Sequence, residues 1–223
     1  MICLLESGQK FPDPRNTDQY DTLAYSLIEE LTPERMIEAY PQGIFPYYAY
    51  KEILVRWCAP KIRYVIFPDE IHISHSMRNL MNKKQYRCTI DTNFEEVIWS
   101  CAKVDGRIYE EGAWLGPDLI KVWIELHERG YAKSVEVWND ENELVGGLYG
   151  FVHGGCFMGD SMFSKEKNAS KLALIHLARH MQAEGGTFID CQYPTTHLDT
   201  MGGREISYDT YLELAKDPKP INW

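Results

Sequence analysis

Hydrophobic and polar positions follow their clearest pattern between residues 144 and 192, where they predict two strands, a helix and a third strand. The run LVGGLYGFVHGGCFMGDSMFS is rich in aromatic and aliphatic residues, and Gly154-Gly155 within it predicts a hairpin turn. A helical stripe follows, formed by Leu174, Leu177, Ala178 and Met181, and Gly185-Gly186 predicts its end. TFIDCQ predicts a short buried strand. A strand–helix–strand order favours a right-handed crossover and a parallel strand pair inside a mixed sheet.

Helices with recognisable ends are predicted upstream of this stretch. Thr32-Pro33-Glu34 provides a threonine cap and a first-turn proline, so a helix is expected to about Tyr40, where Pro41-Gln42-Gly43 ends it. Ser74 is expected to cap a short helix. Thr92 to Glu95 has the spacing of a capping box, which predicts the start of another helix.

The rest of the sequence predicts further helices and strands. Gly116-Pro117-Asp118 opens a helix with an apolar stripe of Leu119, Val122, Trp123 and Leu126, and Gly130 ends it. Strands are expected to end near Trp57 and to occupy IRYVIF and SVEVW. SVEVW and the two strands of the hairpin are expected to form an antiparallel meander of three strands before the crossover helix. A last helix is expected around residues 209–216. Residues 1–31 give no clear pattern.

These elements predict an α+β protein of two parts. Residues 1–62 are expected to form a small N-terminal lobe, and residues 63–223 a larger domain with a mixed sheet and helices. A chain of 223 residues is long enough to build such a core. The aromatic run IFPYYAY is expected to act as a hydrophobic plug between the lobes.

Composition and charge narrow the function classes. No apolar run reaches the roughly 18–20 residues of a membrane span, and the N-terminus lacks a secretory signal. The six cysteines show no paired spacing, which favours a reduced, cytoplasmic protein with buried thiols. A formal net charge of −10 argues against a broad nucleic-acid surface. The locally basic segment HISHSMRNLMNKKQYR provides Arg78 and Lys83, which either contact phosphate or form a solvated face.

Acids interrupt two of the apolar strands. Asp160 lies in the second strand of the hairpin, and Asp190 lies with Gln192 at the end of the last one. Because side chains at i and i+2 of a strand share a face, Asp190 and Gln192 are expected to point together, with Cys191 opposite. A carboxylate beside a carboxamide can take or orient a proton. The alternative is a strand that runs into a loop, with Asp190 bonded by backbone amides.

Several motifs in fixed order resemble one family. GGLYG, GDSMFS, NASK and IDCQ, preceded by YPQGIFPYY, RWCAP, HISHSMR and SVEVW, resemble the leucyl/phenylalanyl-tRNA–protein transferases from about Thr32 to Tyr211. That family generally has a glycine-rich segment where this chain has DTLAYSLIEEL, and more basic residues where it has His75 and Asn79. The order of sheet, helix and strand also resembles the acetyl-CoA-dependent N-acetyltransferase (GNAT-like) fold, which the family shares.

The resemblance implies an aminoacyltransferase, with residues 63–223 as its acyltransferase-like catalytic domain. Such an enzyme moves leucine or phenylalanine, and methionine more weakly, from aminoacyl-tRNA to an N-terminal arginine or lysine of a protein, which marks that protein for N-degron degradation. The ester is already activated, so no ATP, cofactor or covalent enzyme intermediate is implied. The expected partners are the acceptor end of tRNA and cationic N-termini, with no membrane and a monomeric enzyme.

The resemblance also implies roles for particular residues. It assigns catalysis to Asp190 and Gln192, and Asp160 stands where the family has a glutamate that faces the peptide. Substrate contacts are implied for Trp57, Trp114 and Trp123 around the terminal adenosine. Leu148 and Phe157 are implied in the pocket for the donor side chain, with Met162, Phe163 and Leu174 nearby. Phosphate contact is implied for Arg78 and Lys83. No metal site is expected, because neither His72 with His75 nor His176 with His180 has a third ligand.

Three alternatives stay open at the level of sequence. An acetyl-CoA-type N-acyltransferase would share the fold, but the junction SMFSKEKNAS lacks the glycine-rich pyrophosphate loop. A hydrolase could use Cys191 with His197. A non-catalytic tRNA- or peptide-binding protein would also match these residues.

Overall fold

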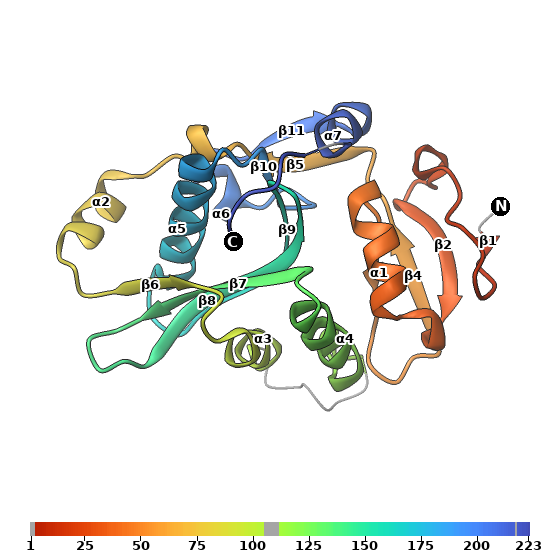
Figure 1. Ribbon diagram of the computed structural model, residues 1–223, viewed down its shortest axis with the longest axis horizontal. Coiled ribbons are helices and arrows are strands. Elements are labelled where there is room, and N and C mark those ends of the chain that lie inside the picture. Colours follow the sequence, from red (N-terminus) through yellow and green to blue (C-terminus); the bar gives the residue numbers. More distant parts are fainter. Residues whose placement is uncertain (1–2, 105–111, 217) are drawn as a thin grey trace.

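The computed structural model describes residues 3–104, 112–216 and 218–223, and its strands form two sheets (Figure 1). The smaller sheet has four strands in the order β1-β2-β4-β3. Its strands are β1 (Cys3–Leu4), β2 (Thr22–Leu27), β3 (Phe45–Tyr47) and β4 (Leu54–Cys58). β1 runs parallel to β2, and β4 pairs antiparallel with both β2 and β3.

The larger sheet has seven strands in the order β11-β5-β10-β9-β8-β7-β6. It is mixed, because β10 runs parallel to β9 and antiparallel to β5. The strands are β5 (Ile62–Ile66), β6 (Arg87–Ile90), β7 (Ala132–Trp138), β8 (Leu144–His153), β9 (Cys156–Ser164), β10 (Phe188–Asp190) and β11 (Arg204–Ser207). The predicted antiparallel meander β7-β8-β9 and the parallel crossover through the next helix are both confirmed.

Helices cover both faces of the larger sheet. α5 (Ala169–Glu184) lies on one face, and Gly185 ends it in the left-handed conformation, as predicted. α3 (Phe94–Ala102) and α4 (Pro117–Glu128) lie on the opposite face. The shorter helices are α2 (His75–Asn82), α6 (Thr196–Asp199) and α7 (Tyr208–Ala215). Two hydrophobic cores result, one beneath α5 and one beneath α3 and α4.

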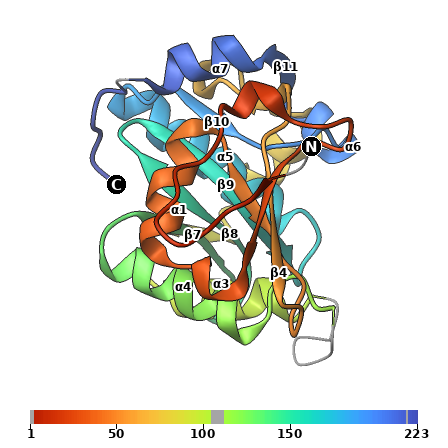
Figure 2. The same cartoon turned by 90° about the vertical axis from the view of Figure 1, so that its right-hand side faces the viewer.

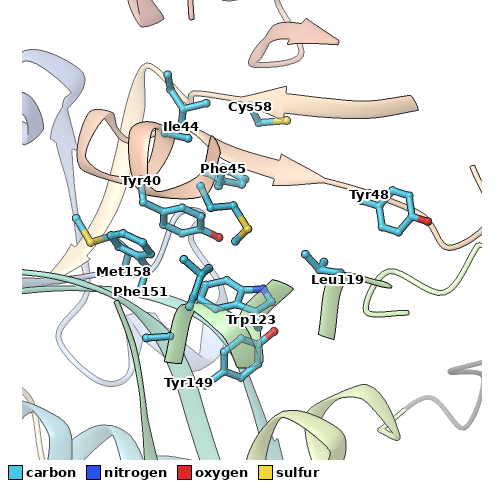
Figure 3. Packing of buried hydrophobic residues seen from close by; sticks show 14 of the residues in the cluster. Tyr40, Ile44, Phe45, Tyr48, Cys58, Leu119, Trp123, Tyr149, Phe151 and Met158 are labelled. Carbon is cyan, nitrogen blue, oxygen red and sulfur yellow. The ribbon is translucent and has the colours of Figure 1, made fainter. Parts of the chain in front are cut away.

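The second of these cores continues into the N-terminal lobe. α1 (Pro33–Ala39) lies between the smaller sheet and α4, as Figures 1 and 2 show from two sides. Tyr40, at the end of α1, packs against Trp123 of α4 and Phe151 of β8, with ring centroids 5.6 Å and 4.8 Å apart (Figure 3). Phe45 and Tyr48 of the predicted aromatic plug are buried in the same core. The N-terminal lobe is therefore held against the larger sheet by aromatic packing.

Most predicted helix ends are correct. Thr32 accepts a hydrogen bond from the Arg35 N–H at 3.2 Å, and Ser74 accepts one from the Met77 N–H at 3.3 Å. The capping box at Thr92 is wrong, because Asn93 is the cap residue and its side chain does not bond the helix backbone. Buried Glu136 of β7 provides acceptors instead, receiving the Thr92 and Asn93 N–H groups at 3.3 and 3.4 Å. A carboxylate from a distant strand thus holds the two residues that precede the helix.

The boundary predicted between residues 62 and 63 lies at the beginning of β5. Described residues before it form the smaller sheet, while the strands of the larger sheet begin with β5. Whether these parts are separate domains stays a prediction. The described helices include none with the length and apolar character needed to cross a membrane.

Candidate active site

A cavity of about 420 Å³ lies where β8, β9 and β10 meet α5 and α6. Leu148, Phe157, Leu174, Leu177 and Ile189 give it apolar walls, and Met162 and Leu198 extend them. The polar lining residues are Asp160, Ser161, Ser170, Asp190, Cys191, Thr195 and His197. Its size suits a small side chain enclosed on several sides by apolar groups.

Asp160 lies at one edge of this cavity, and two tyrosines hold its carboxylate. The Tyr40 hydroxyl donates to Oδ1 at 3.0 Å, and the Tyr149 hydroxyl donates to Oδ2 at 2.8 Å. Burial raises the pKa of Asp160, while hydrogen bonds from Tyr149, Tyr40 and Gln192 oppose that shift. Burial and the Asp160 charge raise the pKa of both phenols well above the ordinary value, so both remain hydrogen-bond donors.

Asp190 forms a buried ion pair with an arginine. Its Oδ2 accepts a hydrogen bond from the guanidinium of Arg63, and both side chains are almost completely buried. Its Oδ1 accepts the backbone N–H of Gln192 at 2.9 Å. Burial by itself would lower the pKa of Arg63, but Asp190, together with nearby Tyr211 and Tyr208, raises it above the ordinary value. Asp190 is thus satisfied by one cation and one backbone amide.

Gln192 does not continue the strand, which corrects the expected parity. β10 ends at Asp190, and Gln192 has a φ of 63°, in the left-handed region. Its side-chain Nε2 donates to the Gly159 carbonyl at 3.4 Å, beside the carboxylate of Asp160. The Asp190 carboxylate is instead directed to Arg63. The carboxamide therefore lies beside Asp160 and Gly159, which line the cavity, and Asp190 supports Gln192 through its backbone N–H.

Leu148 and Phe157 line the cavity together with Met162 and Leu174, whereas Phe163 does not. Phe163 packs in the core on the α3 side of the sheet. The cause is a bulge: Gly150 pairs with Gly159 and Tyr149 with Ser161, which leaves Asp160 as an extra residue. One extra residue reverses the face of every position after it. The same bulge turns Asp160 toward Tyr40 and Tyr149.

The three tryptophans occupy different environments. Trp57 is 0% exposed, donates from Nε1 to Ser26 Oγ at 2.9 Å and packs on Phe11. Trp123 is also 0% exposed, with its ring 5.0 Å from that of Tyr149 (Figure 3). A base cannot stack on either ring in this conformation, because protein atoms cover both faces. Trp114 is 39% exposed, in a segment joined to the N-terminal lobe by the Tyr50 N–H to Ala113 carbonyl bond of 2.8 Å.

Arg78 lies on α2 and Lys83 directly follows that helix, and neither lines the cavity. Both are exposed, and Arg78 Nε donates to the Ile73 carbonyl at 3.0 Å. Figure 1 places α2 beyond α5, on the side remote from the N-terminal lobe. The structure therefore separates these cations from Asp160 and Gln192.

Cys191 and His197 line the cavity without forming a catalytic pair. Burial, reinforced by the charge of Asp190, raises the pKa of the Cys191 thiol, which therefore stays protonated and weakly nucleophilic. Its Sγ is 3.9 Å from the Ile189 carbonyl. Burial and nearby Lys171 lower the pKa of His197. The part of the chain that the structure describes contains no group of three metal-binding side chains.

Comparison with known proteins identifies the family. The family model described as leucyl/phenylalanyl-tRNA protein transferase matches residues 65–216, and the model of its N-terminal domain matches residues 29–61. The chain belongs to the leucyl/phenylalanyl-tRNA protein transferase family.

Relatives with the name leucyl/phenylalanyl-tRNA–protein transferase are similar over most of their length. The protein of Syntrophus aciditrophicus is 49% identical, over 96% of this chain and 88% of its own. That of Pseudomonas fluorescens is 46% identical, over 87% and 86%, and that of Flavobacterium johnsoniae is 44% identical, over 92% and 95%. A solved structure, L-PGS from Bacillus licheniformis, has a TM-score of 0.42 and 17% identity over 81% of this chain and 56% of that one.

Sequence reasoning missed three members of this transferase-family site: Tyr40, Arg63 and Tyr149. Each is buried and bonded to one of the two carboxylates. Arg63 left a signal, because a lone cation inside the apolar strand IRYVI requires a buried partner. The tyrosines left none, since aromatic residues in strands and helix ends are ordinary core residues.

Proposed function

We propose that this protein moves leucine or phenylalanine, and methionine more weakly, from aminoacyl-tRNA to the N-terminal arginine or lysine of a protein. The observation that carries the proposal is the apolar cavity of about 420 Å³ that Asp160 lines, with the Gln192 carboxamide bonded to the lining residue Gly159, in a chain of this family. The product would be marked for degradation by the N-degron route. We further propose that the enzyme is a cytoplasmic monomer and that its larger lobe is GNAT-like.

The cavity would receive the donor side chain. Leu148 of β8 is paired with Met162 of β9, and both line the cavity together with Phe157 of β9 and Leu174 of α5. Apolar walls discriminate by size, and one methylene changes binding by only ~1–3 kcal/mol. Such a pocket therefore accepts several unbranched-at-Cβ donors and binds them with graded preference.

The reaction itself would depend on positioning and on one proton transfer. The acceptor amine attacks the ester carbonyl, an amide bond forms, the bond to the ribose oxygen breaks, and the amine proton ends on that oxygen. The Gln192 carboxamide would orient the amine, and Asp190 would hold Gln192 through its backbone N–H at 2.9 Å. A neutral amide is a poor base, so a ribose hydroxyl would carry the proton.

Asp160 would provide the negative charge that attracts a cationic N-terminus. It lies beside Gln192 and has Tyr40 and Tyr149 as fixed donors, which leave the carboxylate in one orientation. Asp160 is one methylene shorter than the glutamate usual in the family. Its two phenol partners support a role in which the charge acts at the cavity edge.

The tRNA would be held at several separate points. The half-exposed ring of Trp114 can stack on a base, which is worth ~1–3 kcal/mol. Arg78 and Lys83 would contact phosphates farther along the tRNA. For Trp57 and Trp123 we propose a supporting role around the adenosine site, since both are buried and brace the N-terminal lobe and Tyr149.

The test is transfer of labelled phenylalanine from phenylalanyl-tRNA to synthetic peptides. Peptides that begin with arginine or lysine should be labelled, whereas peptides that begin with glutamate, and N-acetylated copies of the arginine peptide, should not. Labelling of all peptides alike would contradict the acceptor specificity. An enzyme that labels none of them would contradict the proposed function.

A further inference from the structure

Arg63 is a buried cation that nothing in the reaction uses directly. It lies on β5 and is 1% exposed. One terminal nitrogen donates to the Gly43 carbonyl at 2.8 Å, and the other donates to Asp190. The guanidinium carbon lies 5.2 Å from the ring centroid of Phe45 and 4.8 Å from that of Tyr211. Arg63 therefore touches both the N-terminal lobe and the last strand before the site.

Fold stability does not account for this arrangement. A buried ion pair is often no more stabilising than a well-packed apolar pair of the same volume, because both charges lose their hydration. Arg63 is also incompletely bonded: its Nε has no hydrogen-bond partner among the described residues. A buried donor without a partner destabilises the folded state. An apolar pair would fill this space at least as well, so another function must favour the charges.

The bonds of Arg63 lead toward both Gln192 and Asp160. Asp190, fixed by Arg63, accepts the N–H of Gln192 and so helps to hold that residue at its φ of 63°. Gly43 follows the turn that begins at Tyr40, whose hydroxyl donates to Asp160. One planar guanidinium therefore sets the distance between the segment that carries Tyr40 and the segment that carries Gln192.

We propose that Arg63 is a positioning residue: through Asp190 it fixes the Gln192 carboxamide, and through Gly43 it locks the N-terminal lobe in register with it. This inference rests on the proposed transfer reaction. Arginine is required because its planar fork can bond the carbonyl and the carboxylate at the same time, whereas the single ammonium of lysine cannot match that geometry.

The test is Arg63→Lys, compared with Arg35→Lys. Arg35 is also buried, lies in α1 and pairs with Glu38 at 3.0 Å, but it does not contact Asp190. Arg63→Lys should lower kcat by about 100-fold, the usual result of displacing a reacting group by roughly 1 Å, with KM for peptide and aminoacyl-tRNA nearly unchanged. Arg35→Lys should leave kcat close to that of the wild type.

Amide hydrogen exchange at Gln192 reports on the local geometry of the site separately from the global stability of the protein. At matched stability, the Gln192 N–H should exchange at least about tenfold faster in Arg63→Lys, and at the wild-type rate in Arg35→Lys. Should Arg63→Lys fail to fold, Phe45→Leu removes one ring beside the guanidinium and should lower kcat several-fold while speeding the same exchange. In either variant, an unchanged kcat, or a lowered kcat with unchanged Gln192 exchange, would overturn the inference.

The proposed function can fail separately. If wild-type protein transfers no phenylalanine, the reaction itself is wrong. If the wild type transfers and Gln192→Ala does not, while Arg63→Lys transfers at the wild-type rate, only the inference about Arg63 is wrong.

Discussion

The two faces of the larger sheet differ in what they bury. The α5 face is apolar and leaves a cavity of about 420 Å³. The opposite face is covered by α3, α4 and the N-terminal lobe, and it buries the charged pair Arg63 and Asp190. It also buries the phenols Tyr40 and Tyr149, which Figure 3 shows. The difference indicates that the two faces of the sheet have different roles. The α5 face selects the donor side chain, and the face toward the N-terminal lobe fixes the groups that act on the amine.

The largest effect is expected on the polar face. Asp190→Ala leaves the Arg63 charge buried and unpaired, so the free energy of unfolding should fall by ~3–5 kcal/mol, as for other broken buried pairs. Transfer should fall by at least about 100-fold, since Gln192 loses its backbone acceptor. Denaturant unfolding and single-turnover transfer measure the two losses.

Gln192→Ala is the matched control for that variant. It removes the carboxamide and leaves the Arg63–Asp190 pair intact, so it should lose transfer while keeping the wild-type midpoint of unfolding. A Gln192→Ala protein as unstable as Asp190→Ala would show that the loss of activity reflects folding.

A smaller effect is expected at Asp160. Asp160→Ala should lower kcat/KM for an arginine peptide by about tenfold or more, the size of a charge-assisted hydrogen bond of ~1.5–3 kcal/mol, while tRNA affinity stays unchanged. Peptide titrations and filter binding of tRNA measure the two quantities. Equal losses of both would refute a role toward the peptide.

The pH dependence of stability provides a second test of Asp160. Burial raises its pKa above the ordinary 3.8, so the folded state binds this proton more tightly than the unfolded chain does. Ionisation of Asp160 therefore lowers the free energy of unfolding as pH rises from 3.8 through the raised pKa. Asp160→Asn should remove this decrease in chemical denaturation at a series of pH values. A decrease that persists unchanged would assign it to another group.

The apolar face should affect preference more than rate. Leu148→Val removes one methylene from the cavity wall, so the ratio of phenylalanine to leucine transfer should rise by up to about tenfold. Phe163→Leu, which changes the α3 face, should leave that ratio alone. Competition between the two aminoacyl-tRNAs measures it. A shift in the Phe163 variant alone would reverse the assignment of the faces.

The smallest effect is expected at Cys191. Because burial keeps its thiol protonated, Cys191→Ser should transfer at nearly the wild-type rate. A variant without activity would return Cys191 to consideration as a nucleophile.

The parts of the fold that follow local patterns could be predicted from the sequence. The stripe of α5, the hairpin at Gly154-Gly155 and the proline start of α1 depend on residues within one or two turns of each other. The capping box failed because buried Glu136, from β7, binds both the N–H and the hydroxyl of Thr92. β6 and β11 were not predicted, since each is a short strand with partly exposed residues.

The candidate site was predicted in composition but not in geometry. The bulge at Asp160 moved Phe163 to the opposite face, and the left-handed Gln192 separated its side chain from that of Asp190. In both cases an irregular backbone conformation at one residue redirects the side chains, and the spacing of residues along the sequence does not encode such a conformation. The bonds from Arg63, Tyr40 and Tyr149 join residues that are far apart in sequence, and they follow only from the packed structure.

The most direct test is the single-turnover rate of phenylalanine transfer to an arginine peptide by wild-type protein and by Gln192→Ala, with tRNA affinity measured alongside. The account predicts rapid transfer by the wild type and a rate at least about 100-fold lower in the variant, at equal tRNA affinity. Transfer by Gln192→Ala at the wild-type rate would contradict it.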